Sequence, residues 1–526
     1  MSEIRRLFAH HLFCLLFIIC LFSCSSSSRL EGYIYYRFNA NPTTLDPALI
    51  TDVSSASIAA KLFNGLVRLN ENLEIVPDIA ERWEISKDGL RYKFFLKRDV
   101  KFSNGREIKA QDFKYSFERV LNPKTKSPNT WVFEKVLGSR EFQDGLSDNV
   151  KGFKVINDYV FEIQLKMPFA PFLSMLTMTP CYVIPEEEVG IKGDGFSSEP
   201  IGSGPFVLKK WLHNRELNLE ANSGYFGEKA KVKGIVYKII PEDLTALAEF
   251  ELGNLDVISL PSSAYSRFKN DKERNKHIIA LNGLNTYYLG MNTSRHPFDN
   301  RNIRRAVAYA IDRERILETF YEGRGRLSIG PVPDILRKWN ISKENILKYN
   351  LEMAEDIIKR EGMYGIKVKM YVAADQDVVD LAEIIQSYLS KVGIDVSIKQ
   401  LEWSAYKDAV NNGEPDMFWL SWWADYPDAE NFLFPLFHSS NIGPAGNRTR
   451  YINKEVDAMI EKGQNSLNER VTNSYYKKAE EIIMQDMPWV PFWHRTDFLI
   501  KQPWIKGYKV HPIYTIDKGA EVAIER

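Results

Sequence analysis

The sequence predicts an α/β protein of at least two lobes, and three observations lead to this prediction. The chain has 526 residues, which is too long for one hydrophobic core, because cores stop growing at about 250–300 residues. Residues 159–165 alternate apolar and polar side chains, the period of a strand with one buried face. Residues 366–401 contain a strand, a helix and a second strand, which indicates parallel neighbours with a right-handed crossover.

The first 23 residues have the pattern of a signal peptide. Two arginines precede an apolar run over 12–22, which is too short to span a bilayer but has the length of a signal-peptide core. The run ends in LFSC, which resembles a bacterial lipobox, and a serine-rich tether over 24–29 follows. We therefore expect a lipoprotein that is acylated at Cys24. The alternative is an ordinary cleaved signal peptide with an incidental cysteine.

Composition and motif content argue against several classes of function. Basic and acidic residues number 69 each, whereas nucleic-acid-binding proteins have a basic excess, so no nucleic-acid partner is expected. Cys181 is the one cysteine after the tether, and a single thiol forms neither an internal disulfide nor a zinc site. The sequence has no H-E-x-x-H, C-x-x-C, G-x-S-x-G or P-loop motif. We expect a protein without catalytic residues, metal or cofactor.

Strand signals dominate the first part of the chain, and strands alternate with helices in the later part. The expected strands are 92–96, 100–102, 159–165, 235–240, 366–374, 394–401 and 418–423. The expected helices, which have apolar residues three and four apart, are 302–320, 378–392 and 474–487. Gly393 and Pro488 mark the ends of the last two helices.

Six motifs follow one another along almost the whole chain after the tether. They are 41–47 (NPTTLDP), 80–105 (AERWEISKDG followed by FFLKRDVKFSNG), 202–206 (GSGPF), 289–292 (LGMN), 304–313 (RRAVAYAIDR) and 422–428 (WWADYPD). Each motif alone is weak, whereas the ordered set is specific. Together they resemble bacterial extracellular solute-binding proteins of family 5, the peptide and nickel class, and especially the oligopeptide- and dipeptide-binding proteins of ABC importers.

This resemblance implies a three-domain periplasmic binding protein of the cluster C type. Domains I and III would clamp the ligand, and domain II would be an accessory lobe. The implied bounds are 30–70 with 195–285 and 500–526 for domain I, 71–194 for domain II, and 286–499 for domain III. Two chain crossings, near 283–288 and 497–503, would form the hinge between domains I and III.

The resemblance also implies a function. The protein would be a monomer of the periplasm or cell surface, held to the membrane by lipid at Cys24. It would capture short peptides by domain closure and deliver them to the permease of an ABC importer. The alternative is the same fold with another ligand, namely a nickel chelate, haem, an oligosaccharide or a peptidoglycan fragment.

Asp425 is the main candidate for a ligand-binding residue. It follows an aromatic strand, and strands of α/β lobes tend to end at ligand clefts. A surface turn is the alternative, because D-Y-P-D is also a turn sequence. By resemblance to peptide-binding members, Asp425 would pair with the ligand ammonium. The same resemblance gives six further ligand-binding candidates. Trp422 and Trp403 would be walls of side-chain pockets, with ordinary core tryptophans as the alternative, and Trp423 and Tyr426 lie beside Asp425 in the sequence. Asn39 and Asn41 would offer backbone hydrogen bonds to an extended ligand, in the manner of strand addition.

One segment departs from the family pattern. The stretch 408–437 contains no Arg, Lys or His, whereas oligopeptide-binding members often place basic residues there for the ligand carboxylate. Val410 and Trp419 stand where arginines would be sought. The carboxylate of a peptide ligand must therefore be met by backbone amides or by a basic residue elsewhere.

Overall fold

The computed structural model describes residues 29–341 and 347–525, so the predicted signal peptide, most of the tether and Cys24 lie outside the described residues. Within those ranges, the strands form one twelve-stranded sheet, a separate four-stranded sheet and two short two-stranded sheets. Helices alternate with these strands, as expected for the α/β class. None of the helices in the described ranges is long and apolar enough to cross a membrane.

Lobe I is built around β1, which lies between two parallel neighbours, β10 and β11. Its elements are β1 (Tyr33–Phe38), α2 (Val53–Leu62), β8 (Phe206–Leu212), β9 (Glu216–Ala221), β10 (Gly234–Ile239), α7 (Asp243–Glu251), β11 (Val257–Ser259), α8 (Ser262–Asn270) and β12 (Ile278–Asn282). The C-terminal residues from 502 onward return to this lobe, where β19 (Ile505–Lys506) pairs with β20 (Ala523–Ile524). Helix α2 begins at Asp52, whose carboxylate accepts a hydrogen bond from the Ser55 amide.

Lobe II is a four-stranded antiparallel sheet in the order β4-β5-β7-β6, packed against helix α3. Its elements are β4 (Ala80–Ile85), β5 (Arg91–Leu96), α3 (Ala110–Leu121), β6 (Phe153–Asn157), β7 (Val160–Gln164) and α5 (Phe172–Met175). A short hairpin of β2 (Val67–Leu69) and β3 (Ile75–Pro77) precedes it in the chain. The strands expected at 92–96 and 159–165 are confirmed as β5 and β7. The strand expected at 100–102 is wrong, because only Lys101 pairs there, in an isolated bridge with Glu107.

Lobe III holds the other part of the twelve-stranded sheet. Its elements are β13 (Asn285–Met291), α9 (Arg301–Ala310), α10 (Arg313–Thr319), β14 (Gly325–Leu327), α11 (Leu351–Arg360), β15 (Ile366–Ala373), α12 (Gln376–Ser390), β16 (Ile394–Leu401), α13 (Trp403–Asn411), β17 (Met417–Trp423), α14 (Glu430–Phe437), α15 (Lys454–Gln464) and α16 (Glu469–Asp486). The predicted parallel pair is confirmed, since β15 and β16 run in parallel register from Ile366 opposite Ile394 to Ala373 opposite Leu401.

Two helix predictions in lobe III need correction. The single helix expected over 302–320 is two helices, α9 and α10, which are separated at Ile311 and Asp312. The Asp312 carboxylate accepts a hydrogen bond from the Arg315 amide, so this residue starts a new helix instead of continuing the first. Helix α16 begins five residues before the expected 474, because the Asn468 side chain caps it.

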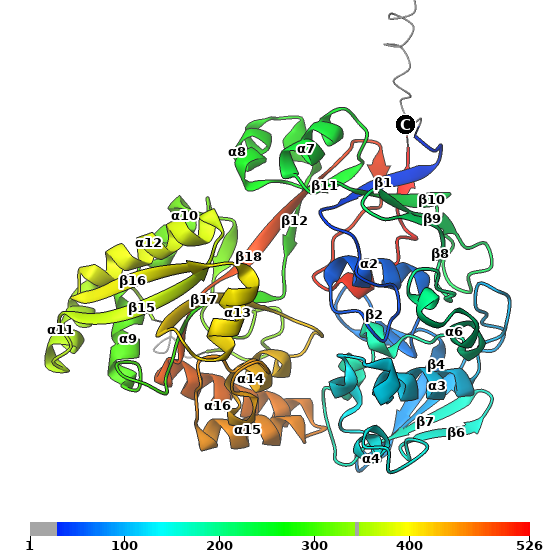
Figure 1. Ribbon diagram of the computed structural model, residues 1–526, viewed down its shortest axis with the longest axis horizontal. Coiled ribbons are helices and arrows are strands. Elements are labelled where there is room, and N and C mark those ends of the chain that lie inside the picture. The colour runs from blue at the N-terminus through cyan, green and yellow to red at the C-terminus, as the bar shows by residue number, and fades with distance from the viewer. Residues whose placement is uncertain (1–28, 342–346, 526) are drawn as a thin grey trace, which may run out of the picture.

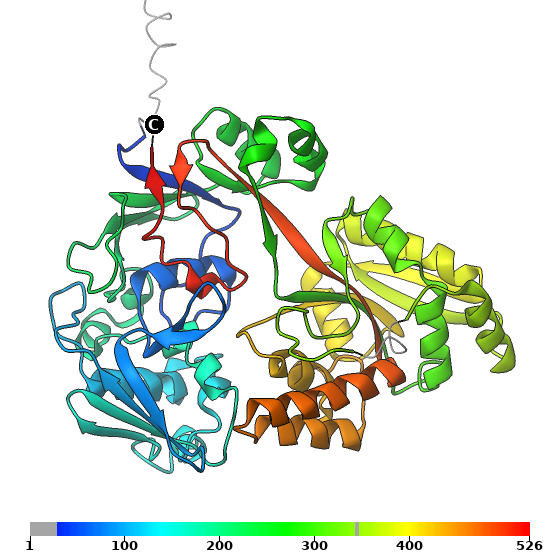
Figure 2. The ribbon, with the colours of Figure 1, turned by 180° about the vertical axis from the view of Figure 1, so that it is seen from behind.

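Two chain crossings connect lobes I and III. One is the pair Gly283 and Leu284, between β12 and β13. The other is β18 (Trp489–Lys501), which runs from lobe III into lobe I (Figures 1 and 2). This strand pairs with β13 and β14 up to Arg495 and with β12 from Thr496 onward. The second crossing thus lies just before the expected 497–503, and the first agrees with the expected 283–288.

The two crossings are hydrogen-bonded to each other. The Asn285 Nδ2 donates to the Arg495 carbonyl at 3.2 Å, and the Arg495 amide donates to the Asn285 Oδ1 at 2.7 Å. A Cβ at Gly283 would lie 2.2 Å from the Asn285 Nδ2, so only glycine allows this close approach without a shift of the asparagine. The two chain crossings between lobes I and III therefore lie side by side, which is the arrangement of a hinge.

Candidate ligand-binding site

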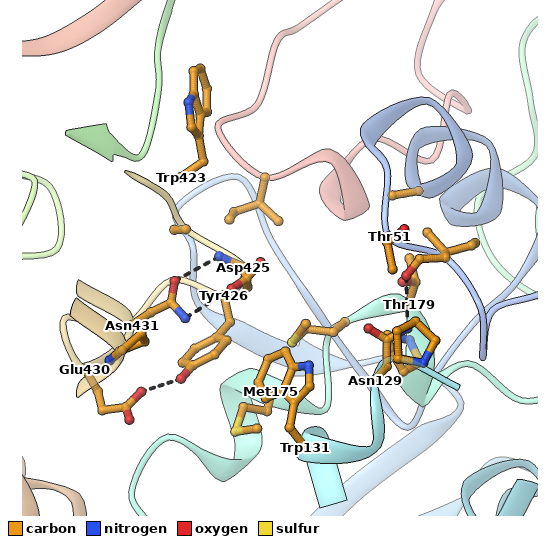
Figure 3. Close-up of a pocket in the computed structure, with 18 of the residues that line it drawn as sticks. Thr51, Asn129, Trp131, Met175, Thr179, Trp423, Asp425, Tyr426, Glu430 and Asn431 are labelled. Atoms are coloured by element: carbon orange, nitrogen blue, oxygen red, sulfur yellow. Dashed lines mark hydrogen bonds between the residues drawn. The ribbon is translucent and has the colours of Figure 1, made fainter. Parts of the chain in front are cut away.

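A cavity of about 690 Å³ lies where the three lobes meet, and its volume is in the range of ligand pockets. Each lobe supplies one wall, with segments at 50–56 and 513–515 from lobe I, 128–135 and 169–180 from lobe II, and 422–435 from lobe III. In Figure 3, Asp425 and Tyr426 lie on one side of the space, and Thr51, Asn129 and Thr179 lie on the other.

The lobe III wall is organised by one buried amide, Asn431. Strand β17 ends at Trp423, and the chain then turns so that the Asp425 amide donates to the Asn431 Oδ1 at 3.0 Å. The same oxygen accepts from the Trp422 indole Nε1 at 3.3 Å. The Asn431 Nδ2 donates to the Asp425 Oδ2 at 3.4 Å. One amide therefore fixes the backbone and side chain of Asp425 (Figure 3). It also holds the ring of Trp422.

The Asp425 carboxylate has no countercharge within the described part of the chain. It forms no ion pair with any described Lys, Arg or His, and its one side-chain partner is the weak contact with Asn431. The side chain is exposed to the cavity, although protein surrounds it on the other sides. This surrounding protein removes water and raises the pKa of Asp425 to about 6, against the lowering effect of the Asn431 hydrogen bond. The site offers a carboxylate that a cationic group can reach.

Glu430, five residues further along, is held differently. Its side chain is 2% exposed, and it accepts a hydrogen bond from the Tyr426 hydroxyl and one from the Gln464 Nε2, the latter at 2.6 Å. Burial raises the pKa of Glu430 to about 7. Since both of its carboxylate oxygens have donors within the protein, Glu430 is a structural group at the base of the cavity.

Lobes II and III touch beside this base. The ring of Tyr426, from lobe III, packs into the apolar core of lobe II, where it lies 6.4 Å from the ring of Trp131. The Ala170 amide of lobe II donates to the Gln464 carbonyl of lobe III at 2.7 Å. The two lobes therefore meet through both an aromatic contact and a backbone hydrogen bond.

A second cavity, of about 470 Å³, lies along β1 and shares Val53, Ile513 and Tyr514 with the first. Asn39 lines it, as the strand-addition hypothesis requires of a residue at the end of β1. Asn41 lines neither cavity, and its Oδ1 accepts a hydrogen bond from the Asn214 amide at 2.8 Å.

The four predicted site residues that are close in sequence line the first cavity: Trp422, Trp423, Asp425 and Tyr426. Trp403 lines neither cavity. It is 54% exposed and opens helix α13, two residues after β16 ends at Leu401. Val410 and Trp419, where arginines were sought, are 1% and 5% exposed in the core of lobe III.

Sequence reasoning missed the lobe II wall and the amide that organises lobe III. The missed residues are Asn129, Trp131, Lys135, Met175, Thr179 and Asn431. Those of lobe II belong to separate short segments without a helix or strand period, so no pattern joins them. The available signal for Trp131 was only a tryptophan in a polar stretch.

The chain matches the model of the bacterial extracellular solute-binding proteins, family 5 Middle, over residues 74–444. It is similar to heme-binding protein A of Haemophilus influenzae, with 29% identity over 93% of this chain and 91% of that protein. It is also similar to the oligopeptide-binding protein OppA of Bacillus subtilis, with 28% identity over 91% and 90%. The solved structure of DppA from Helicobacter pylori in complex with the peptide STSA has a TM-score of 0.78 and 27% identity, over 96% of this chain and all (100%) of that one.

Proposed function

The chain belongs to the bacterial extracellular solute-binding proteins of family 5, and on this premise we propose that it captures short peptides and delivers them to an ABC importer. The family match confirms the resemblance that the six motifs indicated, and the fold match confirms the expected class. The observation that supports a peptide ligand is the carboxylate of Asp425, which faces a cavity shared by three lobes and has no countercharge of its own among the described residues.

A short peptide needs such a group. Its ammonium loses water when a cleft closes over it, and an unpaired buried charge costs several kcal/mol. Asp425 provides the opposite charge at the end of β17, where the backbone is fixed by Asn431. The rings of Trp422 and Trp423 border the same space. Flat aromatic surfaces contact many kinds of side chain, which suits a binder of varied peptides.

The remaining walls suit variable side chains. Met175 and Met178 of lobe II line the cavity, and methionine adapts its shape to its neighbours at little cost. In the second cavity, Arg37 and Phe38 at the end of β1 line the wall beside Asn39, beyond Tyr36, which is the residue of β1 paired with β11. An extended ligand would pair with this end of the strand. We propose that Asp425, Trp422, Trp423 and Tyr426 form the ammonium end of the site, with Asn39 along the ligand.

Capture by closure follows from where the lobes are joined. The walls of the cavity belong to lobes that are connected through Gly283–Leu284 and through β18. A ligand that contacts both sides stabilises the closed state by its difference in affinity for the two states. We propose that the permease recognises this closed state, and that a lipid on Cys24 keeps the protein, as a monomer, at the periplasmic membrane or the cell surface.

The ligand class can be tested on protein freed of bound ligand by unfolding and refolding. We expect calorimetry to detect binding of an equimolar library of di- to pentapeptides. If no peptide binds to correctly refolded protein, the proposal is wrong. Mass spectrometry and visible absorption of the freshly purified protein would then show whether a haem, a metal chelate or a saccharide co-purifies instead.

The anchor can be tested separately. Mass spectrometry of the mature N-terminal peptide is expected to show an acylated Cys24, and the Cys24→Ser variant is expected to lose membrane association. If Cys24 is recovered unmodified and the protein is not associated with the membrane, the proposed lipid anchor is wrong. The proposed ligand class would be unaffected.

A further inference from the structure

The charges that line the first cavity are unequal. Four carboxylates face it, on Asp52, Glu134, Asp425 and Glu430. Among the described residues that line this cavity, Lys135 is the one with a cationic side chain. A ligand that carries its own negative group would therefore meet repulsion everywhere except near this lysine.

Lys135 has no carboxylate partner among the residues that the structure describes. It follows the short helix η2 (Thr130–Phe133) on the lobe II wall and is half-buried. Its Nζ makes no ion pair or hydrogen bond within the described ranges, and lies 6.0 Å from the centre of the Phe169 ring, at the outer limit of a cation–π contact. The ammonium is therefore available to an anionic group that enters the cavity.

The nearby carboxylates are engaged elsewhere. Asp52 accepts hydrogen bonds from the Ser55 amide at 2.8 Å and from the Thr43 hydroxyl at 2.6 Å, as the cap of α2. Glu430 accepts from Tyr426 and Gln464. Besides Glu134, which is exposed to solvent beside Lys135, two charged groups thus remain among the described lining residues, Asp425 on lobe III and Lys135 on lobe II, and neither forms an ion pair with another described residue.

We propose that Lys135 is the partner of the ligand's carboxylate, so that the site selects peptides with a free C-terminus and holds them between Asp425 and Lys135. This inference rests on the proposed function, and it adds the residue and the chemical requirement at the other end of the ligand. The peptide would lie from lobe III to lobe II, and would hold together the two lobes that already touch at Tyr426.

The assignment accounts for the missing basic residues of lobe III. The stretch 408–437 has no cation, and Val410 and Trp419 are packed in the lobe's core, where a charged side chain could not reach the cavity. The carboxylate partner has to come from another lobe. Lys135 is the described lining residue with the required charge, and its Nζ is in no ion pair within the described ranges.

A structural role for Lys135 makes a different prediction. Burial raises the pKa of Glu430, and the charge of Lys135 offsets a small part of this rise, although that carboxylate already has two other donors. If Lys135 served only to balance the charge of Glu430, its replacement would change the stability of the ligand-free protein. It would change the affinities for free-acid and amidated peptides by the same factor. Selectivity between these two peptide forms is therefore the informative measurement.

The test compares two libraries, di- to pentapeptides as free acids and the same sequences as C-terminal amides, on the full-length detergent-purified protein. We expect the wild type to bind the acids more tightly by roughly tenfold to a hundredfold, the value of one charge-assisted hydrogen bond. Lys135→Met should lose this preference, and Lys135→Arg should keep most of it. Lys166→Met is the matched control, because Lys166 is an exposed lysine of the same lobe outside the cavity.

The outcomes separate the inference from the function on which it rests. One outcome is that the free-acid peptides bind, that Asp425→Asn weakens this binding, and that Lys135→Met does not change it. This result overturns the role of Lys135 and leaves the peptide function intact. Equal affinity of the wild type for acids and amides overturns it as well. Failure to bind either library contradicts the peptide function, and the inference with it.

Discussion

The lobe III and lobe II walls of the cavity are built in opposite ways. The lobe III wall comes mainly from one continuous segment that follows the end of β17, and its polar groups are held by Asn431. The lobe II wall comes from separate segments between 128 and 180, and is largely apolar, with Trp131, Met175 and Met178. The first wall has the rigidity needed to recognise a fixed charge, and the second has the adaptability needed for side chains that vary.

The largest expected effect concerns the fixed charge. Asp425→Asn should weaken peptide binding by about 2–5 kcal/mol, because the ligand ammonium would be buried without a countercharge. Asp428→Asn is the matched control, since it makes the same change three residues away, and its side chain caps the Glu430 amide outside the cavity. Calorimetry on both variants tests the comparison. If Asp425→Asn and Asp428→Asn bind peptides with equal affinity, the lobe III wall does not recognise the ligand's charge.

The second prediction separates binding from support within lobe III. Glu430→Ala should lower the free energy of unfolding by about 2–4 kcal/mol, because it leaves a cavity and removes the acceptor of the Tyr426 and Gln464 donors. Glu134→Ala, an exposed carboxylate of the same cavity, should change stability by less than about 0.5 kcal/mol. Urea denaturation measures the free energy of unfolding of both variants. If Glu430→Ala is as stable as the wild type, Glu430 has no structural role.

The third prediction concerns the adaptable wall. Trp131→Ala should weaken binding by about 1–2 kcal/mol, through lost contact with the ligand and with Tyr426. Its ring is 38% exposed, so the stability of the ligand-free protein should change little. The loss should be similar for peptides of different sequence, whereas a loss confined to a few sequences would mean that lobe II carries a specific pocket.

The two walls should also differ in their response to pH. The pKa of Asp425 is raised to about 6, and only its ionised form balances an ammonium. Binding therefore favours the deprotonated state, so affinity is close to full at pH 7 and above and falls as the pH drops through 6. It should be about tenfold weaker at pH 5 than at pH 7, as one-proton linkage requires. Calorimetry should show this decline in the Trp131→Ala protein and not in the Asp425→Asn protein.

The same contrast explains what the sequence could predict. The parallel strands β15 and β16, the helix between them and the strand β17 each have a local period, so their residues indicate structure directly. Asp425 was predictable because it directly follows such a strand within a family motif. Lys135 was not, because it becomes part of the site only when lobes II and III come together. The division of 302–320 into two helices depended on Asp312 acting as a cap, which apolar periodicity does not reveal.

The smallest expected effect on peptide affinity concerns Trp403, one of the two tryptophans predicted to be pocket walls. Trp422 lines the cavity and donates to Asn431, whereas Trp403 is 54% exposed at the start of α13 and lines neither cavity. Trp403→Ala should therefore change peptide affinity by less than about 0.5 kcal/mol, and Trp422→Ala should weaken it measurably more. A loss at Trp403 equal to that at Trp422 would mean that the ligand extends past the two cavities to the end of β16, and that lobe III contributes a second surface beside its fixed charge.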